Sequence, residues 1–70
     1  MDATHQAFTA RLRALMAKKG WSANRLGDLS GLTGSAVAAM LRGEKSPTLR
    51  SMKKLAEALG VRVTDLLDGQ

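Results

Sequence analysis

The sequence contains no cysteine and no tyrosine, a single histidine, and only six carboxylates against eleven lysine and arginine residues. Without cysteine it has neither a disulfide framework nor a thiolate metal site, and nothing indicates an oxidising compartment. Catalysis needs a nucleophile, an acid–base pair or a metal, and the six carboxylates are scattered along the chain. No glycine-rich phosphate loop or metal-ligand spacing is present. We therefore expect no enzymatic activity, no metal or other cofactor, and no small-molecule substrate.

Long apolar runs are also missing, and no cationic segment followed by an apolar stretch opens the chain. This pattern excludes a membrane-spanning segment and a secretory signal, so we expect no membrane partner and a cytoplasmic location. Seventy residues suffice for one small domain, and residues 1–70 are expected to form it. Because a chain this short buries only a modest core, dimerisation would help to stabilise it. Strand-like alternation is confined to residues 61–63, which predicts an all-α fold.

The net charge of +5 favours a polyanionic partner such as nucleic acid. A basic surface that is merely solvated would give the same balance. Charge alone therefore leaves both interpretations open.

Helical spacing of apolar residues predicts three supporting helices, the first, fourth and fifth of the chain, around a central pair in residues 22–43. The first covers residues 3–18, with Gly20 in a left-handed position after it. The fourth begins after a cap at Thr48, with Ser46 as the alternative, and ends at Gly60. A fifth, capped by Thr64, follows. The apolar faces comprise Phe8, Leu12, Leu15 and Met16 in the first helix, and Leu49, Met52, Leu55, Ala56 and Leu59 in the fourth.

The central stretch, residues 22–43, has the pattern of two short helices joined by a tight turn. Ser22 and Thr33 are each placed to cap a helix by accepting a hydrogen bond from a free backbone N–H. Gly31 supplies the turn between them. Gly27 lies inside the first of the two helices, where glycine costs ~1 kcal/mol relative to alanine, so we expect a close helix crossing that leaves no room for a Cβ. Together these features predict a helix-turn-helix unit.

From Phe8 to Leu67 the chain resembles the Cro-like, xenobiotic-response-element type of helix-turn-helix domain found in phage repressors. The landmarks are Leu12, Leu15, Gly20, Ser22, Leu26, Gly31, Val37, Met40, Gly43, Pro47, Leu49, residues 55–61 (LAEALGV) and Leu66. No single landmark is specific, but their joint spacing is. The resemblance implies a compact bundle of five short helices whose third helix enters the DNA major groove.

The resemblance also implies which residues meet double-stranded DNA. Base edges would be met by Gly34, Ser35, Ala38, Ala39 and Lys45, and phosphates by Ser22, Asn24, Arg25, Thr33, Arg42 and Lys45. Long polar residues often occupy the positions of Ala23, Gly34 and Ala39 in the family. Their absence leaves two interpretations open: base recognition is weak, or it is shared among Ser35, methyl contacts, loop residues and DNA shape.

A second departure concerns Met16 and Leu41, where many relatives resemble each other in holding an Arg–Glu ion pair. Packed apolar residues can replace a partly buried ion pair at little cost, so we expect Met16 and Leu41 to touch. In similar proteins the last helix and the loop before the fourth helix often form a two-fold interface. This implies a homodimer with residues 61–67 as the dimerisation region and Val63, Leu66 and Leu67 as candidates. Leu66 equally suits the monomer core.

Two functions remain in view at this point. The first is a transcriptional regulator, expected to be a repressor that binds a pseudo-palindromic operator as a homodimer without a cofactor. The second is an antitoxin-like module that chiefly binds a toxin-like protein and contacts DNA weakly. The lack of long polar side chains on the third helix favours the antitoxin-like module. The positive charge from Arg42 to Lys45 favours the transcriptional regulator.

Overall fold

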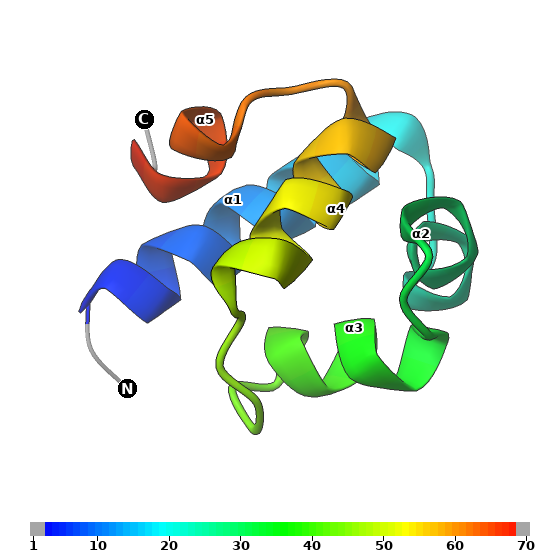
Figure 1. Cartoon of the computed structure of the whole chain (residues 1–70), viewed down its shortest axis with the longest axis horizontal. Helices are drawn as coiled ribbons and strands as arrows, with labels where there is room; N and C mark the ends of the chain where they lie inside the picture. The colour runs from blue at the N-terminus through cyan, green and yellow to red at the C-terminus, as the bar shows by residue number, and fades with distance from the viewer. Residues whose placement is uncertain (1–2, 69–70) are drawn as a thin grey trace.

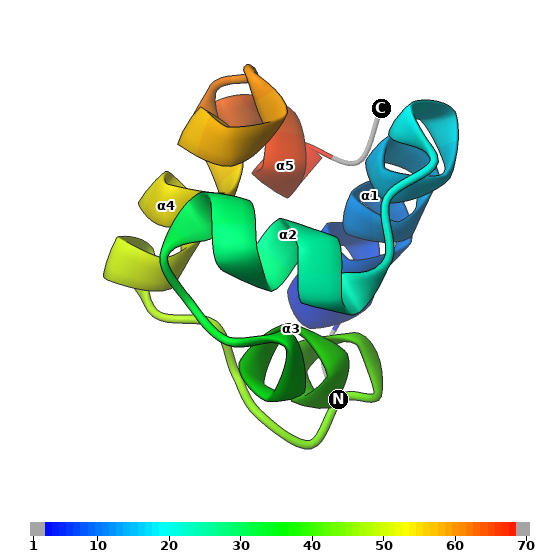
Figure 2. The same ribbon diagram turned by 90° about the vertical axis from the view of Figure 1, so that its right-hand side faces the viewer.

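A computed structural model of the chain describes residues 3–68, and within that range the fold is all-α, as predicted (Figure 1). The helices are α1 (Ala3–Lys19), α2 (Ala23–Ser30), α3 (Gly34–Leu41), α4 (Leu49–Leu59) and α5 (Val63–Asp68). α3 lies along one edge of the molecule with α2 crossing beside it, and α5 lies at the opposite edge (Figures 1 and 2). None of the helices described is long and apolar enough to cross a membrane.

The first helix ends as its sequence predicts. The backbone N–H of Trp21 donates to the Met16 carbonyl at 3.0 Å, and that of Gly20 donates to the Ala17 carbonyl at 3.2 Å. These two bonds form a Schellman closure, which satisfies carbonyl groups that the helix itself leaves without partners. Three residues, 20–22, then connect the end of α1 to the start of α2.

The helix-turn-helix unit has the predicted caps. The Ser22 hydroxyl accepts from the Arg25 N–H at 3.1 Å, and the Thr33 hydroxyl accepts from the Ala36 N–H at 3.0 Å. Gly31 adopts a φ of 79°, which an L side chain would disfavour, and so closes the turn. Ser30 adds a support that the sequence analysis missed. Its buried hydroxyl donates to the Gly27 carbonyl.

The prediction that Gly27 marks a close crossing is confirmed. A Cβ built on Gly27 would lie 2.5 Å from the carbonyl carbon and 2.8 Å from the carbonyl oxygen of Thr33, and would also meet the backbone nitrogen of Gly34. All three are backbone atoms, which cannot rotate away. The start of α3 therefore rests directly on the backbone of α2.

In the last two helices one expectation is confirmed and two are wrong. Thr48 caps α4, since its hydroxyl accepts from the Ser51 N–H at 3.1 Å. Leu49, however, is 59% exposed and does not join the core as expected, because it is the first helical residue and precedes the turn that reaches the core. Thr64 does not cap α5, which begins one residue earlier. The Asp65 carboxylate instead reaches back to accept from the Arg62 N–H at 3.0 Å.

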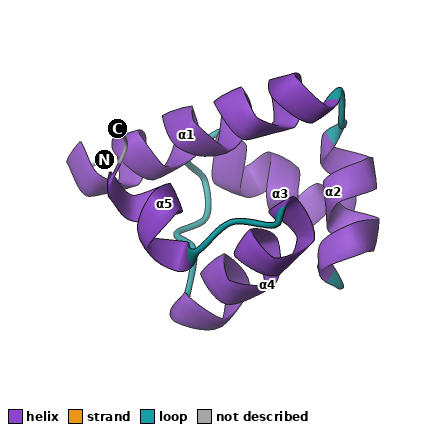
Figure 3. Ribbon diagram, turned by 90° about the horizontal axis from the view of Figure 1, so that it is seen from above, coloured by secondary structure: helices purple, strands orange, loops and turns teal. Residues whose placement is uncertain are grey.

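One apolar core joins all five helices. α5 packs against both α1 and α4, as the view from above shows (Figure 3). The buried core residues are Phe8, Leu12, Leu15, Met16, Leu26, Val37, Met40, Leu55, Ala56, Leu59 and Leu66. This core fixes the position of α3, because Val37 and Met40 are buried in it and Ala36 and Leu41 pack against it.

A hydrogen bond ties α1 to the end of α3. The Arg13 guanidinium donates to the Leu41 carbonyl at 2.9 Å across 28 residues of sequence. Met16, one turn further along α1, is buried, and Leu41 packs half-buried against the same core. Direct contact between Met16 and Leu41 remains a prediction. Arg13 thus supplies a polar tie between these two helices.

Candidate nucleic-acid interface

The outward face of α3 is built by helical spacing. Ala38, Ala39 and Arg42 lie three, four and seven residues after Ser35, a spacing that places all four on one side of a helix. Ser35 and Arg42 are exposed, and the two alanines are half-buried. The opposite side carries Val37 and Met40. The helix therefore presents a smooth surface with a hydroxyl near its start and a guanidinium at its end.

Gly34 contributes to this site in a way that the sequence did not indicate. A Cβ on Gly34 would meet the side-chain oxygen of Asn24 and lie 2.9 Å from the Asn24 Cα. The position thus faces α2, and Gly34 offers only its backbone to a ligand. The Asn24 amide from α2 occupies the place that a side chain at position 34 would take.

Replacing Gly34 by alanine is expected to push the Asn24 side chain aside and shift the first turn of α2. We expect about a tenfold loss of DNA affinity, the size associated with losing one hydrogen bond of about 1.4 kcal/mol. Fluorescence anisotropy on a labelled duplex measures the loss, with thermal unfolding as the check on folding. The same change made in an Asn24→Ala background should cost much less, and a full additional tenfold loss there would contradict the coupling.

The beginning of α2 carries three of the predicted phosphate contacts. Ser22, Asn24 and Arg25 are all exposed. The Ser22 hydroxyl is engaged as a cap acceptor, as is that of Thr33 at α3, but each keeps its own proton to donate. The first N–H groups of a helix are also suited to bind anions. The two helix beginnings and the outward face of α3 thus form one candidate surface.

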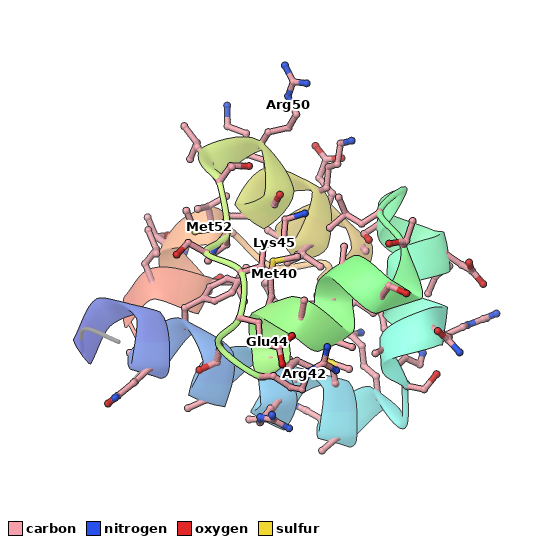
Figure 4. All side chains as sticks on the ribbon, turned by 90° about the horizontal axis from the view of Figure 1, so that it is seen from below. Met40, Arg42, Glu44, Lys45, Arg50 and Met52 are labelled. Carbon is pink, nitrogen blue, oxygen red and sulfur yellow. The ribbon has the colours of Figure 1, made fainter. Side chains whose placement is uncertain are left out.

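The loop after α3 carries the remaining charges, Arg42, Glu44 and Lys45, all exposed. Arg42 and Glu44 form a two-point ion pair, with the Nε and Nη2 groups of Arg42 donating to Oε2 and Oε1 of Glu44 at 2.9 and 3.1 Å (Figure 4). These hydrogen bonds, and then the opposite charges, lower the pKa of Glu44 and raise the pKa of Arg42. The sequence did not predict this pair, because residues two apart on a helix do not face each other.

The three C-terminal interface candidates differ in accessibility. Leu66 is completely buried in the core, so its side chain has no surface to offer a second chain. Val63 is half-buried against the same core, and Leu67 is 37% exposed. Leu49, at the start of α4, adds a more exposed apolar side chain. An interface on this part of the molecule would therefore depend on Leu67, with Leu66 holding α5 in place.

Among the residues that the structure describes, no group of histidine and carboxylate side chains is arranged to hold a metal ion. The surface around α3 instead combines polar caps, small side chains and a charged loop. These features match the chemistry of binding an extended anion better than that of holding a small ligand.

Comparison with known proteins agrees with this geometry. A family profile described as helix-turn-helix matches residues 12–66. Among solved structures, the restriction-modification controller protein C.AhdI from Aeromonas hydrophila has a TM-score of 0.85 and 38% identity, covering 93% of this chain and 98% of that one. The clp gene regulator ClgR from C. glutamicum has a TM-score of 0.84 and 26% identity, covering 99% of this chain and 90% of that one.

Two curated proteins also match in sequence. The SPbeta prophage-derived uncharacterized HTH-type transcriptional regulator YonR of Bacillus subtilis is 34% identical over 89% of this chain. The HTH-type transcriptional regulator SutR of Escherichia coli is 30% identical over 87% of it. The chain spans only 57% and 34% of the lengths of these two proteins. The profile match, the fold and these relatives agree that the chain belongs to the Cro-like helix-turn-helix family of DNA-binding regulators, and not to a family of enzymes.

Proposed function

We propose that this chain is a cytoplasmic transcriptional repressor that binds a pseudo-palindromic operator as a homodimer. The observation that carries the proposal is the outward face of α3, which joins Ser35, Ala38 and Ala39 to the cationic loop at Arg42 and Lys45. A helix of this family lies in the major groove with such a face toward the bases. Because α3 is capped and anchored in the core, it needs no further ordering to bind in the major groove.

Recognition of the operator is shared among weak contacts in this proposal. The Ser35 hydroxyl hydrogen-bonds a base, and the methyl groups of Ala38 and Ala39 contact thymine methyl groups. Because neither alanine projects beyond its Cβ, α3 can sit deep in the groove, with Lys45 reaching a base edge or phosphate from the loop. Sequence-dependent DNA shape supplies the remaining discrimination.

Phosphate contacts fix the register of the domain on the duplex. They come from the first turns of α2 and α3, with Ser22, Asn24, Arg25 and Thr33, and from Arg42 in the loop. The names of the relatives support gene regulation as the role, since one is a restriction-modification controller and another a clp gene regulator.

The test is fluorescence anisotropy of the purified chain on a random-sequence duplex and on the DNA upstream of its own gene, across a salt series. We expect a preference of ~10³-fold or more for the upstream DNA at physiological salt. Equal, weak and steeply salt-dependent binding to both duplexes would leave only phosphate attraction. That result would contradict the repressor and favour an antitoxin-like module that binds a protein partner.

Two observations favour the antitoxin-like alternative. Between Ser35 and Arg42 the outward face of α3 carries no side-chain donor or acceptor. Exposed Leu29, Leu49 and Leu67 offer apolar surface to a protein. The test is co-expression with a neighbouring toxin-like reading frame. Purification of a stable complex of the two proteins would support the antitoxin-like function.

A further inference from the structure

The Arg42–Glu44 ion pair has an unusual origin. Residues two apart in a helix do not face each other. Here Gly43 adopts a φ of 78° between them, so the chain folds back at the end of α3. The Glu44 N–H then donates to the Ala39 carbonyl at 2.9 Å, and the Gly43 N–H donates to the Met40 carbonyl at 3.1 Å. The helix end therefore fixes the backbone of Glu44 beside the Arg42 side chain.

Stability does not explain this pair. The two side chains are 56% and 60% exposed, and exposed ion pairs contribute little to folding because solvent screens them. The Glu44 carboxylate nonetheless occupies the Nε–Nη2 edge of the guanidinium through both of its oxygens. That edge is one that arginine uses for two-point binding of a phosphate. The pair thus competes with the contact proposed for Arg42.

The geometry points to Glu44 as a specificity-determining residue that restrains Arg42 from binding phosphates of non-cognate DNA. This inference rests on the proposed function. While the pair is closed, its two charges cancel, and a loosely placed duplex gains nothing from Arg42. A duplex that seats α3 fully brings a phosphate close to the guanidinium, and Arg42 then exchanges the carboxylate for it. Glu44 therefore weakens non-specific binding more than operator binding.

The experiment compares Glu44→Gln with the wild-type chain on a random-sequence duplex across a salt series. Glutamine keeps the shape of Glu44 and removes its charge. We expect affinity for the random duplex to rise at least fivefold at physiological salt. The slope of log K against log salt should steepen by about 0.9, the value for one added phosphate contact. On the upstream DNA the slope should stay the same, because Arg42 is already engaged there.

Two further variants separate the restraint of Arg42 from a simple change of charge. Glu57→Gln removes one exposed negative charge on α4 and should leave the slope unchanged. In an Arg42→Ala background, Glu44→Gln should have no effect on the random duplex. A gain that persists without Arg42, or an equal gain in Glu57→Gln, would overturn the inference.

The outcome for the wild-type chain keeps this inference distinct from the proposed function. If wild-type protein prefers its upstream DNA and Glu44→Gln changes neither affinity nor slope, only the restraint by Glu44 is wrong. If wild-type protein binds neither duplex, the proposed function fails and the inference fails with it.

Discussion

Replacing Gly27 by alanine is expected to lower the free energy of unfolding by about 2 kcal/mol. The added Cβ would meet backbone atoms of Thr33 and Gly34 at the crossing of α2 and α3. Overpacking typically costs 1–3 kcal/mol, and backbone atoms leave no rotamer through which to escape. The value allows for the helix preference of alanine, which returns ~1 kcal/mol. In a domain of this size the melting temperature should fall by roughly 10 °C.

Gly34→Ala serves as the matched comparison for this prediction, because it adds the same methyl group on the other side of the same crossing. There the Cβ would meet the Asn24 side chain, which can rotate, in addition to the Asn24 Cα. We therefore expect a smaller loss of stability at position 34 than at position 27. Thermal and urea unfolding of both variants provide the measurement. A Gly27→Ala protein as stable as the wild type would show that α3 can move off α2 freely.

The caps of α2, α3 and α4 were predictable because each depends on chemistry within four residues. A hydroxyl before a helix and a free N–H three residues later need no knowledge of the rest of the fold. The same local logic failed at α5, where Thr64 and Asp65 are adjacent and both suit a helix beginning. The carboxylate of Asp65 prevailed, since it accepts the Arg62 N–H and is also favoured by the positive end of the helix.

The outward face of α3 in the candidate site was predictable from family resemblance, but the contacts that hold this helix in place were not. Arg13 reaches the Leu41 carbonyl across 28 residues, a contact that only the packing of α1 on α3 creates. Asn24 over Gly34 likewise depends on the angle between two helices. Sequence spacing indicated that Gly27 lies at a crossing because glycine inside a helix is costly. At Gly34, the first helical residue, no comparable signal distinguished a crossing from a base-facing position.

Leu49 shows the limit of helical periodicity as a guide to burial. Its spacing with Met52 and Ala56 fits the apolar stripe of α4. Periodicity gives the direction of a side chain but not how far along the helix the core extends. Leu49 lies beyond that limit and is exposed. Leu49 lies at the start of α4, directly after the loop before the fourth helix, which the family resemblance connects with dimerisation.

Replacing Leu67 by aspartate is expected to convert the proposed homodimer into a monomer and to lower the affinity for the proposed operator at least 100-fold. Leu67 is the exposed apolar side chain of α5, so a charge there would be buried without a partner in the two-fold interface. A dimer joins two half-site contacts into one binding event, which raises affinity by 10²–10⁴ without a new contact. Sedimentation at micromolar concentration and anisotropy on the upstream DNA measure the two effects.

Leu29→Asp is the matched control for Leu67→Asp, because it makes the same change at another exposed leucine, on α2. It should leave sedimentation unchanged, and both variants should unfold near the wild-type temperature. If Leu67→Asp remained dimeric, the interface would have to lie elsewhere. If wild-type protein sedimented as a monomer even with DNA present, no two-fold operator complex would form. In either case residues 61–67 would be left with the role that Leu66 already has, which is to close the core of the monomer.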